Sequence, residues 1–396
     1  MIPALRARFN AAWTPEAYAR LLDRLQAQTG VVFGFKVSET PCFFPRELMA
    51  GIAHAGVELV EGFLQNPAAR AAADAAVPEA YLGPGQEASP TFVQVDFGLI
   101  RNDAGGVEPR LVELQAFPSL YALQHTLAHA YREVYGLPES LGFHLDGLDS
   151  ASYLALLRDA IVGAHDPAEV VLLEIDPQQQ KTLPDFVLTE QLWGVRTVDL
   201  DDVEVRGRRL YYQRDGRQVQ IKRIYNRVIP DELERLGRRP PFDYRDDYDV
   251  EWTGHPAWYF RLSKFAMPWL NHPVVPKTFF LHEVGRVPGD PARFVLKPLF
   301  SFAGGGIVFD PTDADIAAIP ESQRHLFVLQ ERMAFAPVIE TPDGPTQVEI
   351  RVMYVRAQGR YRPVLTLLRM GRGKMMGVSH NKGLDWVGAS AALLQG

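Results

Sequence analysis

The chain has 396 residues, 47% of them hydrophobic and 22% charged, which is the composition of an ordinary globular protein large enough for two or three domains. Its net charge is −7 and its 41 Lys and Arg residues are scattered, so nucleic acid is not an expected partner. The single cysteine, Cys42, excludes an intrachain disulfide framework, and the lack of any run of 18 apolar residues predicts a cytoplasmic protein with no membrane partner.

The first part of the chain predicts two scaffold helices. Thr14 and Pro15 are typical of a helix start, and Gly30 is typical of a helix end. A second helix is predicted from about Arg46 to Leu64 because its apolar residues recur with helical spacing.

A hairpin of two strands, residues 91–100 and 110–115, follows. Its strands carry Asp96, Glu113 and Gln115, and the last two point to the same face because they are two residues apart. Mg²⁺ takes oxygen ligands and is commonly held by one or two carboxylates beside substrate phosphates, so these residues are candidate metal ligands. The alternative is a set of solvent-facing acids on an edge hairpin.

A helix is predicted from Phe117 to about Val134, with His125 and His129 four residues apart on one face. This spacing can hold zinc, but Thr126 stands where a His-Glu-x-x-His motif has Glu. Two ordinary core histidines are therefore the favoured interpretation.

The middle of the chain alternates helices with strands, which predicts a small parallel sheet. Helices are expected over residues 152–164 and 184–193, with strands over 170–175 and 195–198 and a hairpin over 209–213 and 219–224. Arg227 follows this hairpin and is a candidate clamp for a substrate carboxylate, with an ion pair to Asp231 or Glu232 as the alternative.

Residues 238–251 are rich in acids, Arg and Pro and are expected to form an exposed linker. A helix is predicted over Trp258–Met267, carries Lys264, and is expected to end at Pro268.

The stretch Arg293–Asp310 combines a strand that delivers Lys297, a loop containing Gly304, Gly305 and Gly306, and a second apolar strand. A lysine at a strand end is a point charge for a polyphosphate, and glycines allow the backbone N–H groups to approach phosphate oxygens. The Gly-x4-Gly-Lys-Ser/Thr phosphate loop is absent. The alternative is a tight hairpin beside a surface lysine.

The order of these pieces resembles the ATP-grasp superfamily. In that family a strand lysine, a glycine hairpin and a Gln/Glu-Glu hinge bind ATP, and an acidic-x-Arg strand and an Arg before an Asn-x-Gly turn follow. The matching residues are Lys297, Gly304 to Gly306, Gln330, Glu331, Met333, Glu349-Ile350-Arg351, Arg369 and Asn381-Lys382-Gly383, with Lys264 as a further phosphate ligand.

The family usually ends with Asp and Glu-x-Asn as magnesium ligands, but few residues follow Asn381 here. The corresponding pieces lie near the front, as Asp96 and Glu113-Leu114-Gln115. This order is similar to that of the circularly permuted, glutathionylspermidine synthetase-like ATP-grasp proteins. Gln115 stands where that family has Asn.

The resemblance implies an α+β fold, a circularly permuted ATP-grasp fold with an α/β pre-ATP-grasp-like substrate domain. Residues 1–150 would supply helices and the permuted metal-binding strands, 151–245 the substrate domain, and 246–396 the nucleotide-binding lobes. The implied activity is ATP- and Mg²⁺-dependent ligation of a small-molecule or peptide carboxylate to an amine through an acylphosphate, with Arg351 and Arg369 as catalytic residues and Arg227 and Asn381 as possible substrate ligands. A kinase using the same cleft and a catalytically silent nucleotide-binding regulator are the alternatives.

Overall fold

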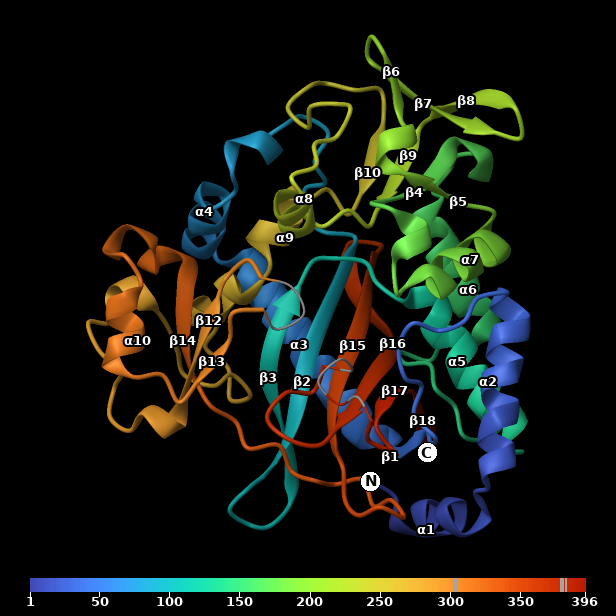
Figure 1. Cartoon of the computed structure of the whole chain (residues 1–396), viewed down its shortest axis with the longest axis vertical. Helices are drawn as coiled ribbons and strands as arrows, with labels where there is room; N and C mark the ends of the chain where they lie inside the picture. The colour runs from blue at the N-terminus through green and yellow to red at the C-terminus, as the bar shows by residue number, and fades with distance from the viewer. Residues whose placement is uncertain (302–304, 378–380, 382) are drawn as a thin grey trace.

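The computed structural model describes residues 1–301, 305–377, 381 and 383–396. Its central feature is a five-stranded antiparallel sheet in the order β17-β16-β15-β2-β3 (Figure 1). Two hairpins from opposite ends of the chain lie side by side in this sheet, because β15 pairs with β2. The strands are β2 (Phe92–Arg101), β3 (Val107–Gln115), β15 (Gln347–Ala357), β16 (Arg360–Gly371) and β17 (Gly388–Ser390).

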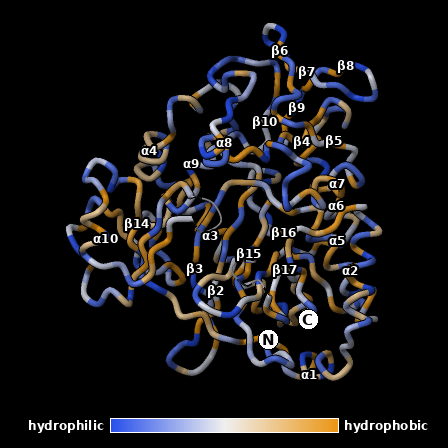
Figure 2. The backbone as a smooth tube through the Cα atoms, viewed as in Figure 1, coloured by the Kyte–Doolittle hydropathy of each residue, from blue (hydrophilic) through white to orange (hydrophobic). Residues whose placement is uncertain are grey.

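The two faces of the central sheet have different surroundings. One face packs its apolar side chains against α3 (Arg46–Gln65). Part of the other face packs against α5 (Tyr121–Val134) and α6 (Ser150–Ile161). Successive side chains of a strand point to opposite faces, so both faces of the buried strands supply core residues. Figure 2 shows hydrophobic segments along these strands and helices and hydrophilic segments in the outer loops.

A parallel sheet in the order β10-β9-β4-β5 forms a second part of the molecule and confirms the predicted small parallel sheet. Because β10 pairs with β9, this sheet extends beyond residue 245. The predicted second hairpin strand, 219–224, is divided between two sheets at Lys222. The elements here are β4 (Val170–Glu174), α7 (Leu183–Trp193), β5 (Arg196–Asp199), β6 (Glu204–Arg206), β7 (Arg209–Arg214), β8 (Arg217–Ile221), β9 (Arg223–Asn226), α8 (Pro230–Leu236) and β10 (Glu251–Thr253).

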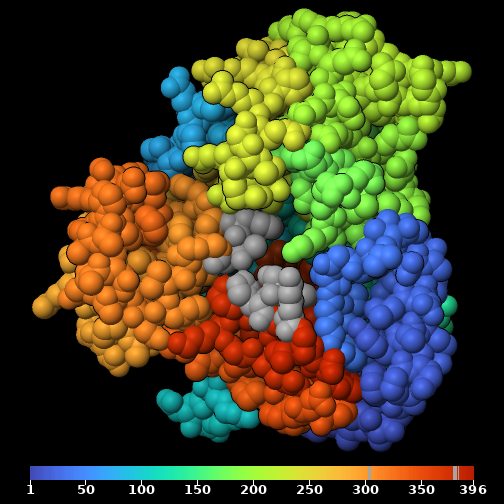
Figure 3. Space-filling view, viewed as in Figure 1, coloured from blue at the N-terminus to red at the C-terminus, as the bar shows by residue number. Residues whose placement is uncertain are grey.

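A small antiparallel sheet in the order β11-β14-β12-β13 forms the third part. One of its faces covers a separate apolar cluster that includes Leu281 and Ile316 of α10 (Asp313–Ala318). Figure 3 shows this part (orange), the parallel-sheet region (green and yellow) and the C-terminal strands (red) meeting around one central area of the surface. The strands are β11 (Thr278–Phe280), β12 (Phe294–Pro298), β13 (Val308–Phe309) and β14 (Phe327–Glu331).

The ends of the chain meet in a two-stranded parallel sheet of β1 (Cys42–Pro45) and β18 (Ala392–Gln395). The predicted first helix is confirmed as α2 (Pro15–Thr29): Thr14 Oγ1 accepts a hydrogen bond from the Ala17 N–H, and Gly30 has a φ of +68°. Every helix among the described residues is too short or too polar to cross a bilayer. The remaining helices are α1 (Pro3–Ala12) and α4 (Pro67–Ala75).

Two predictions about the segment before the small sheet are wrong. The helix expected over Trp258–Met267 consists of α9 (Ala257–Arg261) and a separate 3-10 helix, Lys264–Trp269, because Ser263 interrupts the first helix and caps the second. The segment 238–251 is only partly exposed, since Phe242 and Tyr244 are buried in a cluster with Trp252.

His125 of α5 is buried and His129 is half-buried, and both contact neighbouring side chains. His125 Nδ1 lies 3.2 Å from His144 Nε2, and the His125 ring stacks on Tyr153 at a centroid distance of 5.0 Å. His129 Nε2 lies 2.9 Å from Ser150 Oγ. Burial, with the charges of His129 and Arg132 adding to it, lowers the pKa of His125 to about 3 and that of His144 to about 4. Both rings are therefore neutral over a wide pH range.

We predict that these two histidines make the protein sensitive to acid. Their pKa values in the folded state lie below 6.5, so the unfolded chain binds more protons as the pH falls, and stability present above pH 6.5 is lost toward pH 4. Each histidine contributes about 2 kcal/mol to this loss between about pH 7.5 and pH 5. In urea unfolding, His125→Asn should flatten the dependence of the unfolding free energy on pH, whereas His54→Asn on the exposed side of α3 should not. Equal slopes for His125→Asn and the wild type would contradict this.

Candidate active site

A charged cluster lies on the face of the central sheet opposite α3. It contains Asp96 of β2, Glu349 and Arg351 of β15, and Arg369 of β16. Asp96 is the direct neighbour of Arg351 across the β2–β15 pair, and Glu349 is the direct neighbour of Arg369 across the β15–β16 pair. Since directly paired residues share a face, the register alone brings all four side chains together.

The cluster is held by charge-assisted hydrogen bonds. Arg351 binds the Asp96 carboxylate with two nitrogens: Nε donates to Oδ1 and Nη2 to Oδ2, both at 2.6 Å. Arg369 Nη2 contacts the same Asp96 Oδ2 and lies 2.5 Å from Glu349 Oε1. Such bidentate pairs between guanidinium and carboxylate groups are among the strongest hydrogen bonds in proteins.

The two acids of the cluster differ in their ionisation. Burial acts to raise the pKa of Asp96, but Arg351 and Arg369 outweigh it and hold that pKa below the usual value. At Glu349 burial dominates, and the nearby charges of Asp96 and Glu113 add to it, so the pKa rises to about 7 although Arg369 opposes this. Asp96 is therefore a fixed anion, and Glu349 titrates near neutral pH.

The hairpin β2–β3 brings Glu113 directly opposite Asp96. The register then shifts, because Asp96 faces Glu113 whereas Phe97 faces Leu111, and this leaves Val112 as an extra residue in β3. Such bulges bend a strand and redirect its neighbouring groups.

Two lysines from other elements approach this bulged strand. Lys297 Nζ lies 3.5 Å from the Val112 carbonyl oxygen. Lys264 Nζ lies 3.7 Å from Glu113 Oε2 and donates to the Ser301 carbonyl oxygen at 2.9 Å. The strand with Glu113 therefore meets positive charge from both the 3-10 helix and the small sheet.

Two glutamines complete the polar cluster. Gln94 Oε1 accepts a hydrogen bond from Arg351 Nη1 at 2.9 Å. Gln115 lies opposite Gln94 in the β2–β3 pair, and with its amide oxygen turned toward Arg351 it accepts from Nη1 at 3.1 Å and from Nη2 at 2.5 Å. Arg351 is thus surrounded by oxygen acceptors from both strands of the hairpin.

The small sheet presents Lys297 and Gln330 on one face. Lys297 is paired with Val328 across β12–β14, and Gln330 is paired with Val295, so the two polar residues share the face that points away from the separate apolar cluster. Burial lowers the pKa of Lys297 to about 8, with Lys264 adding to this and Glu113 opposing it. Gln330 Nε2 is buried and has no hydrogen-bond partner.

Of the remaining predicted nucleotide ligands, those among the described residues follow β12 or lie at and just after the end of β14. Gly304 lies outside the described residues, whereas Gly305 and Gly306 are exposed beyond β12. Glu331 ends β14, and its carboxylate forms a 2.8 Å ion pair with Arg293. Met333 is half-buried just after it.

Gly306 meets a specific backbone requirement in this loop. Its φ is +72°, and a Cβ atom at this position would approach Pro298 Cγ to 2.8 Å. Only glycine adopts this conformation without strain.

Among the described residues, Arg227 pairs with neither Asp231 nor Glu232, and its role as a clamp for a substrate carboxylate stays a prediction. Arg227 is buried at the end of β9, its Nη1 donates to the Pro118 carbonyl oxygen, and its Nε lies 4.0 Å from Glu174 Oε2. The proposed ion pair with Asp231 or Glu232 is therefore wrong. Burial raises the pKa of Glu174 to about 8 despite this nearby arginine.

Asn381 closes the loop that follows β16. Its Oδ1 accepts from the Arg372 N–H at 2.8 Å, and its Nδ2 donates to the carbonyl oxygens of Met375 and Gly377, both at 3.1 Å. An amide oxygen accepts two hydrogen bonds and an amide nitrogen donates two, so Oδ1 keeps capacity for a substrate donor, whereas Nδ2 would have to release one loop carbonyl.

Gln94 was not among the predicted site residues, and Glu349 was named only as the acid of the acidic-x-Arg match. A signal was present for both, because Gln94 lies two residues before Asp96 and Glu349 two residues before Arg351, and residues two apart in a strand share a face. The charged cluster is therefore wider than the predicted metal and phosphate ligands.

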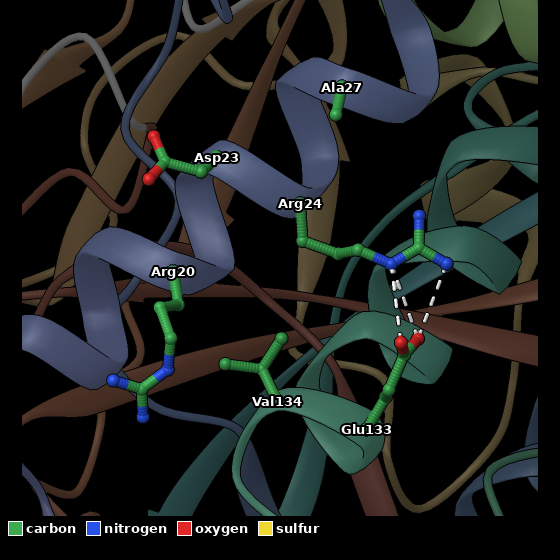
Figure 4. Close-up of a pocket in the computed structure, with 6 residues that line it drawn as sticks. All are labelled: Arg20, Asp23, Arg24, Ala27, Glu133 and Val134. Carbon is green, nitrogen blue, oxygen red and sulfur yellow. Dashed lines mark hydrogen bonds and ion pairs between the residues drawn. The ribbon is translucent and has the colours of Figure 1, made fainter.

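A separate surface groove of about 480 Å³ lies between α2 and α5 (Figure 4). Arg24 and Glu133 face each other across it, with Arg24 Nε 3.3 Å from Glu133 Oε2. None of its lining residues belongs to the charged cluster. The lining consists of Arg20, Asp23, Arg24, Ala27, Glu133 and Val134.

Comparisons with known proteins bear on the fold. No protein-family model matches the sequence, and no curated protein matches it. Among solved structures, the chain is similar to a glutathione synthetase-like effector (GSS30) from Globodera pallida in its apo form. The TM-score is 0.58 at 13% sequence identity, and the match covers 96% of each chain. The protein therefore has a mixed α/β fold like that of this effector.

We predict that Asp96 is essential for stability. Asp96→Ala leaves two arginines of the cluster without their shared carboxylate and should lower the unfolding free energy by about 3–5 kcal/mol. Glu108→Ala on the same hairpin removes an acid whose ion pair with Arg110 is half-exposed, and should cost about 1 kcal/mol or less. Urea unfolding measures both values, and similar losses in the two variants would disprove a central role for Asp96.

Proposed function

We propose that the protein is a circularly permuted ATP-grasp enzyme that joins a carboxylate to an amine with consumption of ATP. The main support is the placement of Lys297 on the small sheet over the hairpin that carries Asp96, Glu113 and Gln115. These residues come from distant parts of the chain and have the chemistry that a metal-bound polyphosphate requires. The fold of the glutathione synthetase-like effector is consistent with this activity.

The residues present fit ATP. The ammonium groups of Lys297 and Lys264 are suited to phosphate oxygens, and the loop glycines Gly305 and Gly306 are suited to cover them. The amide nitrogen of Gln330 is buried without a partner and offers a hydrogen-bond donor to the adenine ring. Glu331 and Met333 follow it in the hinge segment at the end of β14. ATP supplies the phosphoryl group for activation of the acid.

The residues present also fit Mg²⁺. Asp96, Glu113 and Gln115 offer the oxygen ligands that this ion prefers. Among the described residues, however, no group of three His, Cys, Asp or Glu side chains lies in an arrangement that could hold a metal by itself. The ion would therefore depend on phosphate oxygens to complete its coordination, and it would neutralise phosphate charge.

The proposed reaction has two displacements. A carboxylate oxygen of the acid attacks the terminal phosphorus of ATP and ADP leaves, which forms an acylphosphate. The amine nitrogen then attacks the acyl carbon, the phosphate leaves, and the nitrogen loses a proton. Arg351 and Arg369 stabilise the transferred phosphoryl group and the oxyanion of the second step, and Lys297 holds the phosphates.

The acid and amine substrates are proposed to bind between the cluster and the parallel sheet. Ligands of open parallel sheets bind at the carboxyl ends of the strands, and Glu174 and Arg227 lie at those ends of β4 and β9. Arg227 also contacts the Pro118 carbonyl just after β3. It therefore connects this edge with the hairpin that carries Glu113.

A catalytically silent nucleotide-binding regulator is the second candidate. The observation that favours it is Gln115, whose amide oxygen can accept two hydrogen bonds from Arg351 and then has less capacity to ligate a metal. Long incubation with ATP and a panel of acids and amines separates the candidates. The ligase releases ADP and free phosphate, a kinase leaves a phosphorylated product, and the regulator leaves ATP unchanged.

We predict that adenine nucleotides stabilise the protein through Lys297 and Glu113. ADP or ATP with Mg²⁺ should raise the melting temperature of the wild type, because a ligand that binds only the folded state stabilises it. Lys297→Ala should abolish the rise, and Glu113→Gln should abolish its dependence on Mg²⁺. The exposed Lys181→Ala is the matched control and should behave like the wild type. A folded wild type that shows no shift would refute the nucleotide site.

We predict that Gln330→Leu weakens the binding of adenine nucleotides without lowering the stability of the protein. The substitution removes a buried nitrogen that has no partner, so the unfolding free energy should stay the same or rise. Adenine nucleotides should bind at least about tenfold more weakly, since a lost hydrogen bond of typical strength has this effect. Calorimetric titration and urea unfolding measure the two quantities. An unchanged affinity would show that the adenine ring does not bind at Gln330.

A further inference from the structure

Basic side chains engage the oxygen donors proposed for the metal. Both carboxylate oxygens of Asp96 accept hydrogen bonds from arginines. Oδ1 accepts from Arg351, and Oδ2 accepts from Arg351 and from Arg369. The Gln115 amide oxygen is turned toward Arg351 as well. At Glu113 the contact is looser, with Lys264 Nζ at 3.7 Å.

The charged cluster and the three side chains beside it, Glu113, Lys264 and Lys297, together contain more positive than negative groups. The bases are Arg351, Arg369, Lys264 and Lys297, and the acids are Asp96, Glu113 and Glu349. A divalent cation entering beside Asp96 would meet two guanidinium charges in a site shielded from water, where like charges repel strongly. A polyphosphate, in contrast, brings the negative charge that this set of groups attracts.

The acid and the bases of this arrangement differ in the reach of their side chains. Asp96, Arg351 and Arg369 all lie in strands that are paired on both sides, so their backbones have equally little freedom to move, and the short Asp96 side chain stays close to its strand. Arg369 is longer, and 23% of its side chain is exposed. Its Nε is buried without a hydrogen-bond partner, so its contacts in the ligand-free state are incomplete.

We infer that Arg351 and Arg369 occupy the metal site in the ligand-free protein, and that a divalent cation binds there only together with a nucleotide. Arriving phosphates bind the guanidinium groups and draw them from Asp96, which exposes the carboxylate oxygens to the cation. This inference rests on the proposed function, because it requires a polyphosphate ligand. It adds an order of binding. The basic side chains bind the nucleotide, and the acidic side chains bind the metal afterwards or at the same time.

The test measures Mn²⁺ binding without nucleotide, by the loss of the electron paramagnetic resonance signal of free Mn²⁺. The wild type should bind weakly or not at all. Arg369→Gln should bind Mn²⁺ at least about tenfold more tightly than the wild type, because it removes one of the repelling charges. Arg362→Gln is the matched control, since Arg362 lies on the same strand β16 but pairs with Asp146 away from the cluster. It should behave like the wild type.

Circular dichroism checks that each variant is folded, and Arg369→Lys provides a second variant that keeps the charge and should bind Mn²⁺ like the wild type. Tight Mn²⁺ binding by the wild type alone, or a folded Arg369→Gln protein that gains no affinity, would overturn the inference.

A separate arm shows which proposal fails. ADP in the presence of EDTA should still raise the melting temperature of the wild type, because the bases receive the phosphates without a metal. If ADP binds and Mn²⁺ alone binds equally well, only the order of binding is wrong. If ADP binds neither with Mg²⁺ nor with EDTA, the proposed function itself fails.

Discussion

The arrangement of the site depends on the bidentate contact between Asp96 and Arg351. It joins β2 to β15, and so joins the hairpin near the front of the chain to the hairpin near its end. Removing a carboxylate and a guanidinium from water is costly, and the cost is offset only where the geometry is good and further partners complete the hydrogen bonds. Arg369 and Gln94 are those partners, and they fix the side chains that surround Asp96.

The end of the site that carries the lysines depends on the contact between the central sheet and the small sheet. The bulge in β3 leaves Val112 without a partner residue in β2. The carbonyl oxygen of Val112 lies 3.5 Å from Lys297 Nζ of the small sheet. Lys264 approaches the next residue, Glu113, from the 3-10 helix that precedes the small sheet. The ammonium groups of two long side chains thereby converge on one strand that is fixed by its pairing with β2, so the proposed phosphate and metal ligands lie close enough to contact one bound molecule.

The parallel sheet is connected to the same strand through the turn after β3. Arg227 donates to the Pro118 carbonyl oxygen and lies over the Phe117 ring, with its guanidinium carbon 5.0 Å from the ring centroid. A buried arginine in this position connects the edge of the parallel sheet with the end of the hairpin. The distance between the proposed acceptor region and the cluster is therefore set by packing as well as by chain connectivity.

Most local elements follow from the amino-acid sequence alone. The apolar pattern predicted both strands of the front hairpin, and the order of Lys297, Gln330 and Arg351 resembles that of the ATP-grasp family and so predicted a nucleotide site. The helix over Trp258–Met267 was predicted wrongly because the capping effect of Ser263 on the next turn outweighed the apolar spacing. Which acid meets which base became known from the folded chain, because partners across a sheet depend on register and on the bulge at Val112, and neither follows from the spacing of residues along one strand.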